Sequence, residues 1–461
     1  MLDNSKWDVV GDKVIEDDFY RQDHRLLFRV VSRLATSGNP IDVITVSEEL
    51  QRLGELENAG GMGYLAELAE KTPSASNVRS YANIVHERAV LRRLIQVSGE
   101  ISDSAFNPTG RSTNELLDDA ERKVFKISES SAGQESGPSS VNPVLTKTLE
   151  RIEELFDAPD GITGVTTGFK DLDDMTSGLQ PSDLIILAGR PAMGKTSLAT
   201  NIAFNIAEAY EPEIQPDGTS KAINGGIVGF FSLEMAAEQL ATRIIAEQTE
   251  ISSSKIRRGE INDSEFEKLV ACSQMMHRIP LYIDQTGGIS IAQLAARARR
   301  LKRQRGLDVL IIDYIQLMQG SKRTDNRVQE ITEITTGLKA LAKELNVPII
   351  ALSQLSRQVE NRDDKRPQLS DLRESGSIEQ DADVVLFVYR DEYYLQNREP
   401  DFGTTEYEQW QVKLDAARGK ADVIIAKQRH GPTGTAQLSF TPEFTRFADL
   451  IDDDHLPERF E

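Results

Sequence analysis

The chain carries Gly189-Arg190-Pro191-Ala192-Met193-Gly194-Lys195-Thr196, and this stretch decides the fold because it matches the phosphate-loop pattern G-x-x-x-x-G-K-[ST] without a gap. An apolar run at 184–188 precedes it and predicts a buried strand, and residues 197–203 predict the start of a helix. A strand, a glycine-rich turn and a helix in this order aim backbone N–H groups and the helix dipole at one point, which suits a polyphosphate. We therefore expect Lys195 to reach the β- and γ-phosphates and the Thr196 hydroxyl to bind Mg²⁺.

Length, charge and cysteine content limit the number of domains, the cellular compartment and the classes of function that fit this chain. The 461 residues predict two to three domains, and a single cysteine, Cys272, excludes an internal disulfide and fits a reducing compartment. No apolar run is long enough to span a membrane, and the N-terminus shows no signal-peptide pattern. The net charge of −21 argues against a protein that coats nucleic acid, but it leaves open a locally basic channel.

Composition divides the chain into three parts. Residues 1–127 predict an all-helical domain, with amphipathic helices over 20–36 and 77–101. Residues 128–163 predict a polar linker followed by an amphipathic helix at 144–156, which could dock on its own domain or on a neighbouring subunit. Residues 164–461 alternate strand-like and helix-like runs.

That alternation predicts an α/β domain with a mostly parallel sheet covered by helices. The segment 210–224 is polar and predicts a surface insertion. The expected strands are 184–188, 227–231, 281–283, 309–312, 348–352, 384–389 and 423–426.

Three polar residues follow expected strands, at the sheet edge where ligands bind in such folds. Asp313 is the candidate Mg²⁺ carboxylate, although an aspartate there could also cap the next element. Glu234 could polarise the attacking water or could be an ordinary first-turn glutamate. Gln354 could sense the γ-phosphate or could be a solvated loop residue.

Basic residues form three further candidates. Lys427 and Arg429 follow an expected strand, and they could stabilise a transferring phosphoryl group or form a surface pair. The arginines and lysines of 297–305 are interpreted as a solvated helix face. Two loops are candidates for a phosphodiester chain, although such charges are often simply solvated. Their basic residues are Lys322, Arg323 and Arg327 in one loop and Arg357, Arg362, Lys365, Arg366 and Arg373 in the other.

Several motifs together resemble bacterial replicative DNA helicases of the DnaB type, over nearly the whole chain. They occur in the family's order: GRPAMGKT, FFSLEM (230–235), LIIDYIQLM (310–318), ALSQLSR (351–357), SDLRESGSIEQDAD (370–383) and IIAKQRHGPTG (424–434), with IEDDFYRQDHRLLF (15–28) in the helical part. The phosphate loop alone would not separate this family from other ATPases, but SDLRESGSIEQDAD and the AKQR of 426–429 together do.

The resemblance implies a role for each matching residue. Glu234 would be the catalytic base, Asp313 the metal carboxylate and Gln354 the γ-phosphate sensor. Arg429, with Lys427, would reach into the next subunit's site. Nucleotide contacts would come from residues 189–197 and Arg243, which are Gly189, Arg190, Pro191, Ala192, Met193, Gly194, Lys195, Thr196, Ser197 and Arg243. DNA contacts would come from Arg373, Glu374 and Gly376, and the charged loop adds Arg323 and Arg327 as candidate DNA contacts.

The resemblance also implies a RecA-like ATPase domain, a helical collar and a linker helix docked on a neighbour. It implies a homo-hexameric ring that moves 5′ to 3′ on single-stranded DNA at replication forks, driven by ATP with Mg²⁺. Its partners would be primase and helicase loader or initiator proteins. It would be located in the cytoplasm, at replication forks in the nucleoid. Relatives usually carry an additional stretch before the segment that begins here at Met1, so we expect a shortened collar. A strand-exchange recombinase and an ATP-held assembly scaffold are the rival interpretations.

Overall fold

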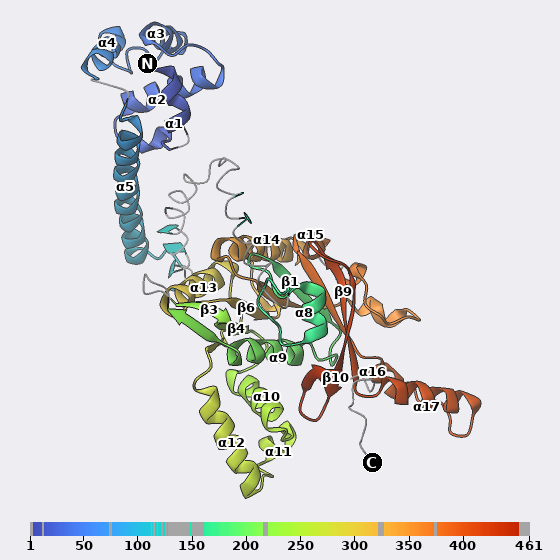
Figure 1. Ribbon diagram of the computed structural model, residues 1–461. Helices are drawn as coiled ribbons and strands as arrows, with labels where there is room; N and C mark the ends of the chain where they lie inside the picture. The colour runs from blue at the N-terminus through green and yellow to red at the C-terminus, as the bar shows by residue number, and fades with distance from the viewer. Residues whose placement is uncertain are drawn as a thin grey trace. The chain divides into compact units, whose positions relative to one another are not determined.

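The computed structural model describes residues 3–11, 13–72, 76–111, 161–214, 220–320, 327–372 and 376–450, with isolated residues between 113 and 149 (Figure 1). The chain divides into two compact units, residues 1–149 and 150–461. Most of the expected linker helix at 144–156 lies outside the described residues.

The N-terminal unit is helical where it is described, as the sequence predicts. The expected amphipathic helices are present as α2 and α5 (Figure 1). On α2 the buried residues are Leu26, Leu27, Val30 and Leu34, whereas α5 buries only Ala82 and Ala89 among its described side chains. The helices are η1 (Asn4–Lys6), α1 (Trp7–Val10), η2 (Glu16–Asp18), α2 (Gln22–Thr36), α3 (Val43–Arg52), α4 (Gly61–Lys71) and α5 (Val78–Phe106).

A buried carboxylate ties η2 to α5 in this unit. Asp18 is 1% exposed, and its side chain accepts from the backbone N–H of Ile15 at 3.0 Å and pairs with the guanidinium of Arg93. Its backbone carbonyl accepts from Arg92 at 2.5 Å, and His86 Nδ1 lies 3.4 Å from Oδ2. A buried charge needs partners of this kind, so these contacts hold η2 against the middle of α5.

The second unit is built on a nine-stranded sheet with the order β11-β10-β9-β8-β1-β7-β6-β4-β5. The six strands from β8 to β5 are parallel, and β9, β10 and β11 extend the sheet as antiparallel strands. The strands are β1 (Leu184–Gly189), β4 (Val228–Ser232), β5 (Leu281–Asp284), β6 (Val309–Asp313), β7 (Ile349–Gln354), β8 (Val384–Tyr389), β9 (Lys420–Gln428), β10 (Gly434–Thr441) and β11 (Arg446–Asp449).

The prediction of a mostly parallel sheet is confirmed, and every strand expected from the sequence is present. Strands β10 and β11 were not expected. The polar insertion at 210–224 contains a hairpin of two short strands, β2 (Glu211–Ile214) and β3 (Ser220–Asn224).

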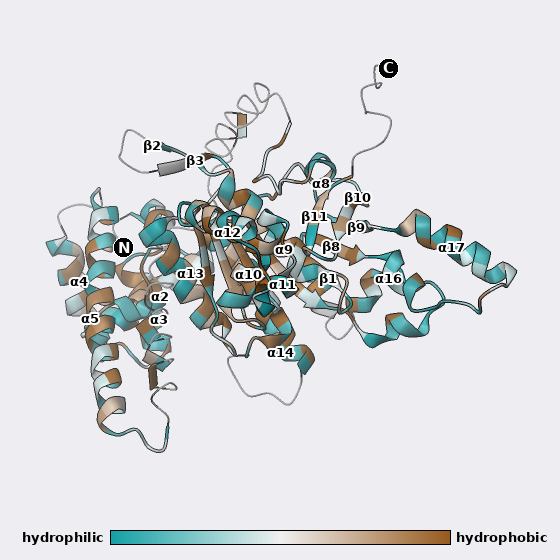
Figure 2. Ribbon diagram, turned by 90° about the horizontal axis from the view of Figure 1, so that it is seen from below, coloured by the Kyte–Doolittle hydropathy of each residue, from teal (hydrophilic) through white to brown (hydrophobic). Residues whose placement is uncertain are grey.

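Helices cover both faces of this sheet, which explains why its central strands are apolar throughout (Figures 1 and 2). Along β1, Ile185 and Leu187 pack with α8, α9 and α10, whereas Leu184, Ile186 and Ala188 pack with α13, α14 and α15. The helices are α8 (Lys170–Thr176), α9 (Lys195–Glu208), α10 (Ala237–Thr249), α11 (Ser253–Arg258), α12 (Asp263–Met276), α13 (Ile291–Arg305), η4 (Ile315–Leu317), α14 (Arg327–Leu345), η5 (Arg357–Asn361), η6 (Leu369–Leu372), α15 (Gly376–Asp381), α16 (Asp391–Gln396) and α17 (Thr405–Ala417).

Candidate nucleotide-binding site

The register of the parallel strands brings the predicted residues to one edge of the sheet. Gly189, at the end of β1, pairs with Gln354 at the end of β7. Ser232, at the end of β4, pairs with Asp313 at the end of β6, and Glu234 follows two residues after β4. The carboxyl ends of β1, β4, β6 and β7 therefore surround one cavity of about 1120 Å³.

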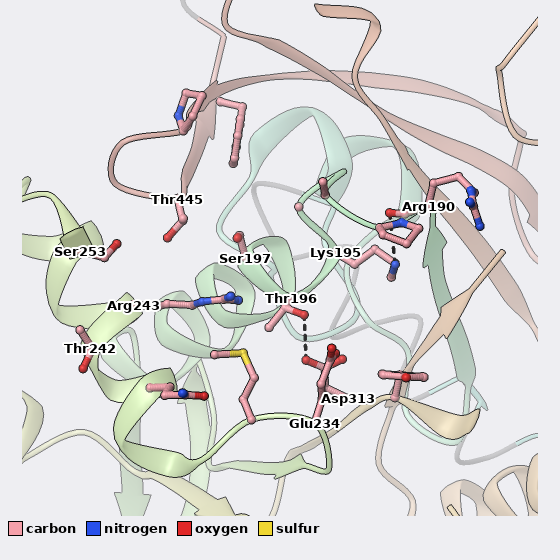
Figure 3. A pocket seen from close by; sticks show the side chains of 18 of the residues that line it. Arg190, Lys195, Thr196, Ser197, Glu234, Thr242, Arg243, Ser253, Asp313 and Thr445 are labelled. Atoms are coloured by element: carbon pink, nitrogen blue, oxygen red, sulfur yellow. Dashed lines mark hydrogen bonds between the residues drawn. The ribbon is translucent and has the colours of Figure 1, made fainter. Parts of the chain in front are cut away.

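The phosphate loop lines this cavity, and α9 begins at Lys195 (Figure 3). The loop needs unusual backbone angles, with φ of 66° at Ala192 and 96° at Gly194. A Cβ on Gly194 would lie 2.9 Å from the ring of Phe447, so glycine is required there for space as well as for φ. Pro191 and Ala192 line the cavity, while Met193 is buried beneath it at 1% exposure.

Lys195 lies across the loop. Its Nζ donates to the carbonyl of Gly189 at 2.7 Å and to that of Arg190 at 3.3 Å. Burial lowers the pKa of Lys195 to about 8, although the carboxylates of Asp313 and Glu234 act in the opposite direction. Among the described residues the Lys195 ammonium donates only to these neutral carbonyls, so a phosphate anion would offset the hydration that the ammonium loses on burial.

Thr196 and Asp313 meet above the first turn of α9. The Thr196 hydroxyl donates to Asp313 Oδ2 at 2.8 Å (Figure 3). Asp313 is 1% exposed, and burial raises its pKa to about 6, partly offset by the Thr196 hydroxyl. A hydroxyl and a buried carboxylate are oxygen ligands that Mg²⁺ prefers, and Mg²⁺ usually takes its remaining ligands from water and substrate phosphates. The residues present therefore fit a magnesium ion.

Glu234 and Arg243 complete the polar wall. Both line the cavity, Glu234 from the turn before α10 and Arg243 from α10 itself (Figure 3). Burial lowers the pKa of Arg243, and the carboxylates of Asp313 and Glu234 oppose that effect. Ser197 is 6% exposed at the start of α9 and also lines the cavity. Gln354 also lines the cavity, from the end of β7.

Arg190 points away from this cluster and joins the loop to the segment after β7. Its Nε donates to Glu360 at 2.9 Å and its NH1 to the carbonyl of Leu355 at 2.9 Å. In the part of the chain that the structure describes, Arg190 therefore fixes the phosphate loop to the segment that follows β7.

Sequence reasoning missed one side of the cavity, which comes from β8, β10 and the turn after β10. Arg390 follows β8 directly, and its guanidinium lies 4.1 Å from the ring centroid of Phe440 on β10. Pro442 and Thr445 line the same side. The alternation of buried Ala436, Leu438 and Phe440 is a strand signal that could have located β10.

Lys427 and Arg429 lie at the opposite edge of the sheet. Strand β9 runs antiparallel to β8, so Gln428 pairs with Val384 at the amino end of β8. Lys427 Nζ donates to the carbonyls of Glu379 and Ala382 at 2.6 and 2.7 Å. The Arg429 side chain is 48% exposed and its NH1 lies 3.4 Å from Asp383. Within one chain, neither side chain joins the residues around Lys195.

The candidate DNA-contacting residues are only partly described. Arg323, Arg373 and Glu374 lie outside the described residues, and Gly376 is the first residue of α15. Arg327 begins α14, where its guanidinium pairs with Glu330 and donates to the carbonyl of Gln316.

Most of the other basic residues in the second loop are already paired. Arg362 binds Asp371 at 2.9 Å, and Arg366 pairs with Asp422. Lys365 is 8% exposed and donates to the carbonyls of Glu360 and Arg362. These contacts give the three side chains a structural role in the loop, whereas the predicted DNA contact of Arg373 falls on a residue outside the described ones and stays a prediction.

The fold and the cavity define a P-loop ATPase, with a phosphate loop, a metal-compatible Thr–Asp pair and polar strand ends on one edge of a parallel sheet. Comparison with known proteins extends this class. Residues 1–87 match the DnaB-like helicase N terminal domain and residues 164–449 the DnaB-like helicase C terminal domain.

Similar proteins cover almost the entire chain. Replicative DNA helicase DnaB of Haemophilus influenzae is 44% identical over 98% of this chain and 91% of its own length. The Geobacillus stearothermophilus protein of the same name is 43% identical over 95% of this chain and 89% of its own. A solved structure of a DnaB-like replicative helicase and its interactions with primase matches with a TM-score of 0.70 and 30% identity, over 97% of both chains.

The ATPase domain of G40P matches with a TM-score of 0.58 and 36% identity, over 68% of this chain and all of its own. The chain therefore belongs to the DnaB family of replicative DNA helicases, which are ATP-dependent enzymes. Among the residues that the structure describes, no helix is long and apolar enough to cross a membrane.

Proposed function

We propose that this helicase works as a homo-hexameric ring that moves 5′ to 3′ on single-stranded DNA and separates the strands of replication forks. The observation that supports a ring is the position of Arg429, which lies at the sheet edge opposite to Lys195. A guanidinium that stabilises phosphoryl transfer must reach the γ-phosphate, and a finger supplied in trans accelerates the reaction by roughly 10³–10⁵. Arg429 can do so only from a neighbouring copy.

The proposed roles at the cavity follow from its contacts. Residues 189–197 would hold the triphosphate through Lys195 and their backbone N–H groups, except for Pro191, which has none, and Arg243 would contact it from α10. Glu234 would accept the proton of the attacking water, and Gln354 would sense the γ-phosphate from the end of β7. When bound to Thr196 and Asp313, Mg²⁺ would neutralise charge on the phosphates and orient them. The Arg390–Phe440 side offers a stacking surface for the base.

The proposed partners extend this scheme. Single-stranded DNA would contact Arg323, Arg327, Arg373, Glu374 and Gly376, mostly through its backbone, so binding should weaken with salt and depend little on base sequence. The solved relative was described with primase, and we propose primase as a partner of this N-terminal unit too. We also propose that helicase loader and initiator proteins bind this helicase, and that it works in the cytoplasm at replication forks in the nucleoid.

Unwinding of forked DNA with only a 5′ or only a 3′ tail tests the proposal. Wild type is compared with Lys195→Ala, which removes the phosphate ligand, and with Lys268→Ala, which removes an exposed lysine on α12. We expect unwinding that requires the 5′ tail and Lys195 and is unaffected by Lys268→Ala. A 3′ requirement would overturn the polarity, and DNA-stimulated ATP turnover without unwinding would overturn the motor. The absence of both activities would favour the scaffold.

A further inference from the structure

Gln316 holds the backbone of Gln354 from a neighbouring element. It lies in η4, directly after β6 and three residues beyond Asp313. Its Nε2 donates to Ser353 Oγ at 2.9 Å and to the Gln354 carbonyl at 3.4 Å, and its Oε1 accepts from the Gln354 N–H at 3.3 Å. One amide side chain therefore satisfies both backbone polar groups of the proposed γ-phosphate sensor.

The backbone of Gln316 is held in turn from α14. Its carbonyl accepts from Arg327, whose guanidinium also pairs with Glu330. Glu330 accepts as well from the backbone N–H of Gly320 at 2.8 Å, and both partners lower the pKa of Glu330. The Arg327 side chain is 46% exposed, so an external anion can reach it without unfolding the helix.

We propose that Gln316 is a positioning residue that couples the DNA contact at Arg327 to the nucleotide sensor Gln354. The inference rests on the proposed roles of those two residues. Arg327 donates to Glu330 through NH1 and to the Gln316 carbonyl through NH2, so a DNA phosphate that attracts the guanidinium outward competes with Glu330 for its charge and pulls on both bonds. Releasing that carbonyl frees η4, and the amide that holds Gln354 moves with it.

Coupling of this kind is reciprocal. If the nucleotide state changes DNA affinity by a factor α, DNA changes nucleotide affinity by the same factor, and such factors are typically about 5–150. A residue on the route between the sites should change α more than it changes either affinity alone. A residue with a merely structural role would lower both affinities and leave their ratio unchanged.

The test compares Gln316→Met, which keeps side-chain length and removes the amide, with Gln319→Met, the same change at an exposed glutamine three residues away. Fluorescence anisotropy gives the affinity of labelled oligo-dT in ADP and in a non-hydrolysable ATP analogue, and their ratio is α. We expect Gln316→Met to lower α at least fivefold or to about 1, with the KM for ATP within twofold of wild type. Gln319→Met should keep α within twofold.

A Gln316→Met protein with wild-type α, or a wild type whose α is already 1, would overturn the inference. If Gln316→Met does not fold, Gln316→Glu is the second variant. It keeps the acceptor for the Gln354 N–H but loses both donated bonds and sets a carboxylate oxygen against the Gln354 carbonyl, so it should also lower α. An unchanged α there counts against the inference equally. Failure of the wild type to bind oligo-dT would refute the proposed function itself.

Adding Arg327→Lys checks that the two residues act in series. Lysine keeps the charge but cannot hold Glu330 and the Gln316 carbonyl in one fork. The double variant should lower α no further than Gln316→Met alone. Independent, multiplicative losses would refute the proposed link.

Discussion

Replacing Glu247 by glutamine should make the ATPase unit more stable at alkaline pH and leave it unchanged in acid. Glu247 lies on α10 with 4% of its surface exposed, facing Asn201 of α9. Among the described residues, Glu247 Oε2 and Asn201 Nδ2 have no hydrogen-bond partner, and Asn201 Oδ1 accepts from the N–H of Phe447 at 2.7 Å. Burial raises the pKa of Glu247 to about 7, against the opposing effects of Asn201 and Arg446.

The magnitude follows from proton linkage. The ordinary pKa is 4.5, so between pH 4.5 and about 7 the folded protein keeps a proton that the unfolded chain has lost. The free energy of unfolding therefore falls as pH rises through this window, by about 1.4 kcal/mol per pH unit and roughly 3 kcal/mol in all. Glutamine does not titrate, so the variant lacks this fall. The variant and wild type should match near pH 4.5 and differ by roughly 3 kcal/mol at pH 8.

Urea unfolding followed by tryptophan fluorescence measures this difference. The chain has two tryptophans, Trp7 and Trp410, so a Trp7→Phe background leaves Trp410 to report on the ATPase unit alone. Glu267→Gln, at an exposed position on α12, controls for the loss of one negative charge. Parallel pH profiles for wild type and Glu247→Gln would show that the carboxyl ionises normally in the fold, and the reasoning from burial would be wrong.

Three more predictions follow from contacts described above. Mixing Arg429→Ala with Lys195→Ala should restore part of the ATP turnover that each lacks alone, because mixed rings contain intact interfaces; no recovery at any ratio would contradict a role in trans. Asp313→Asn should raise the Mg²⁺ concentration for half-maximal turnover by at least the roughly 10–100-fold that loss of an outer-shell metal partner costs, and an unchanged Mg²⁺ titration would remove Asp313 from the metal site. Asp18→Asn should destabilise the N-terminal unit by about 2 kcal/mol, because the charge-assisted bond between Arg93 and the buried carboxylate is lost, and urea unfolding followed by Trp7 in a Trp410→Phe background would detect it.

The sequence was sufficient to place the phosphate loop, Asp313 and Gln354, because apolar runs mark the strands and parallel strands end at one edge. It was not sufficient for Arg390 and Phe440, which approach the loop from strands distant in the chain. Nor could it show that Arg362 and Arg366 are neutralised by Asp371 and Asp422, since such pairing depends on tertiary packing. The local sequence pattern predicts which residues lie at the strand ends, whereas the tertiary fold determines which distant residues they contact.

The separation of Lys195 and Arg429 on opposite edges of one sheet has a consequence for control. A rigid, helix-covered sheet keeps these edges apart, so the proposed finger can never fold back onto the phosphate loop of its own chain. A lone copy would bind ATP yet hydrolyse it poorly, and turnover per chain would rise with protein concentration until rings are complete. ATP hydrolysis would then depend on assembly, so free subunits would consume little ATP.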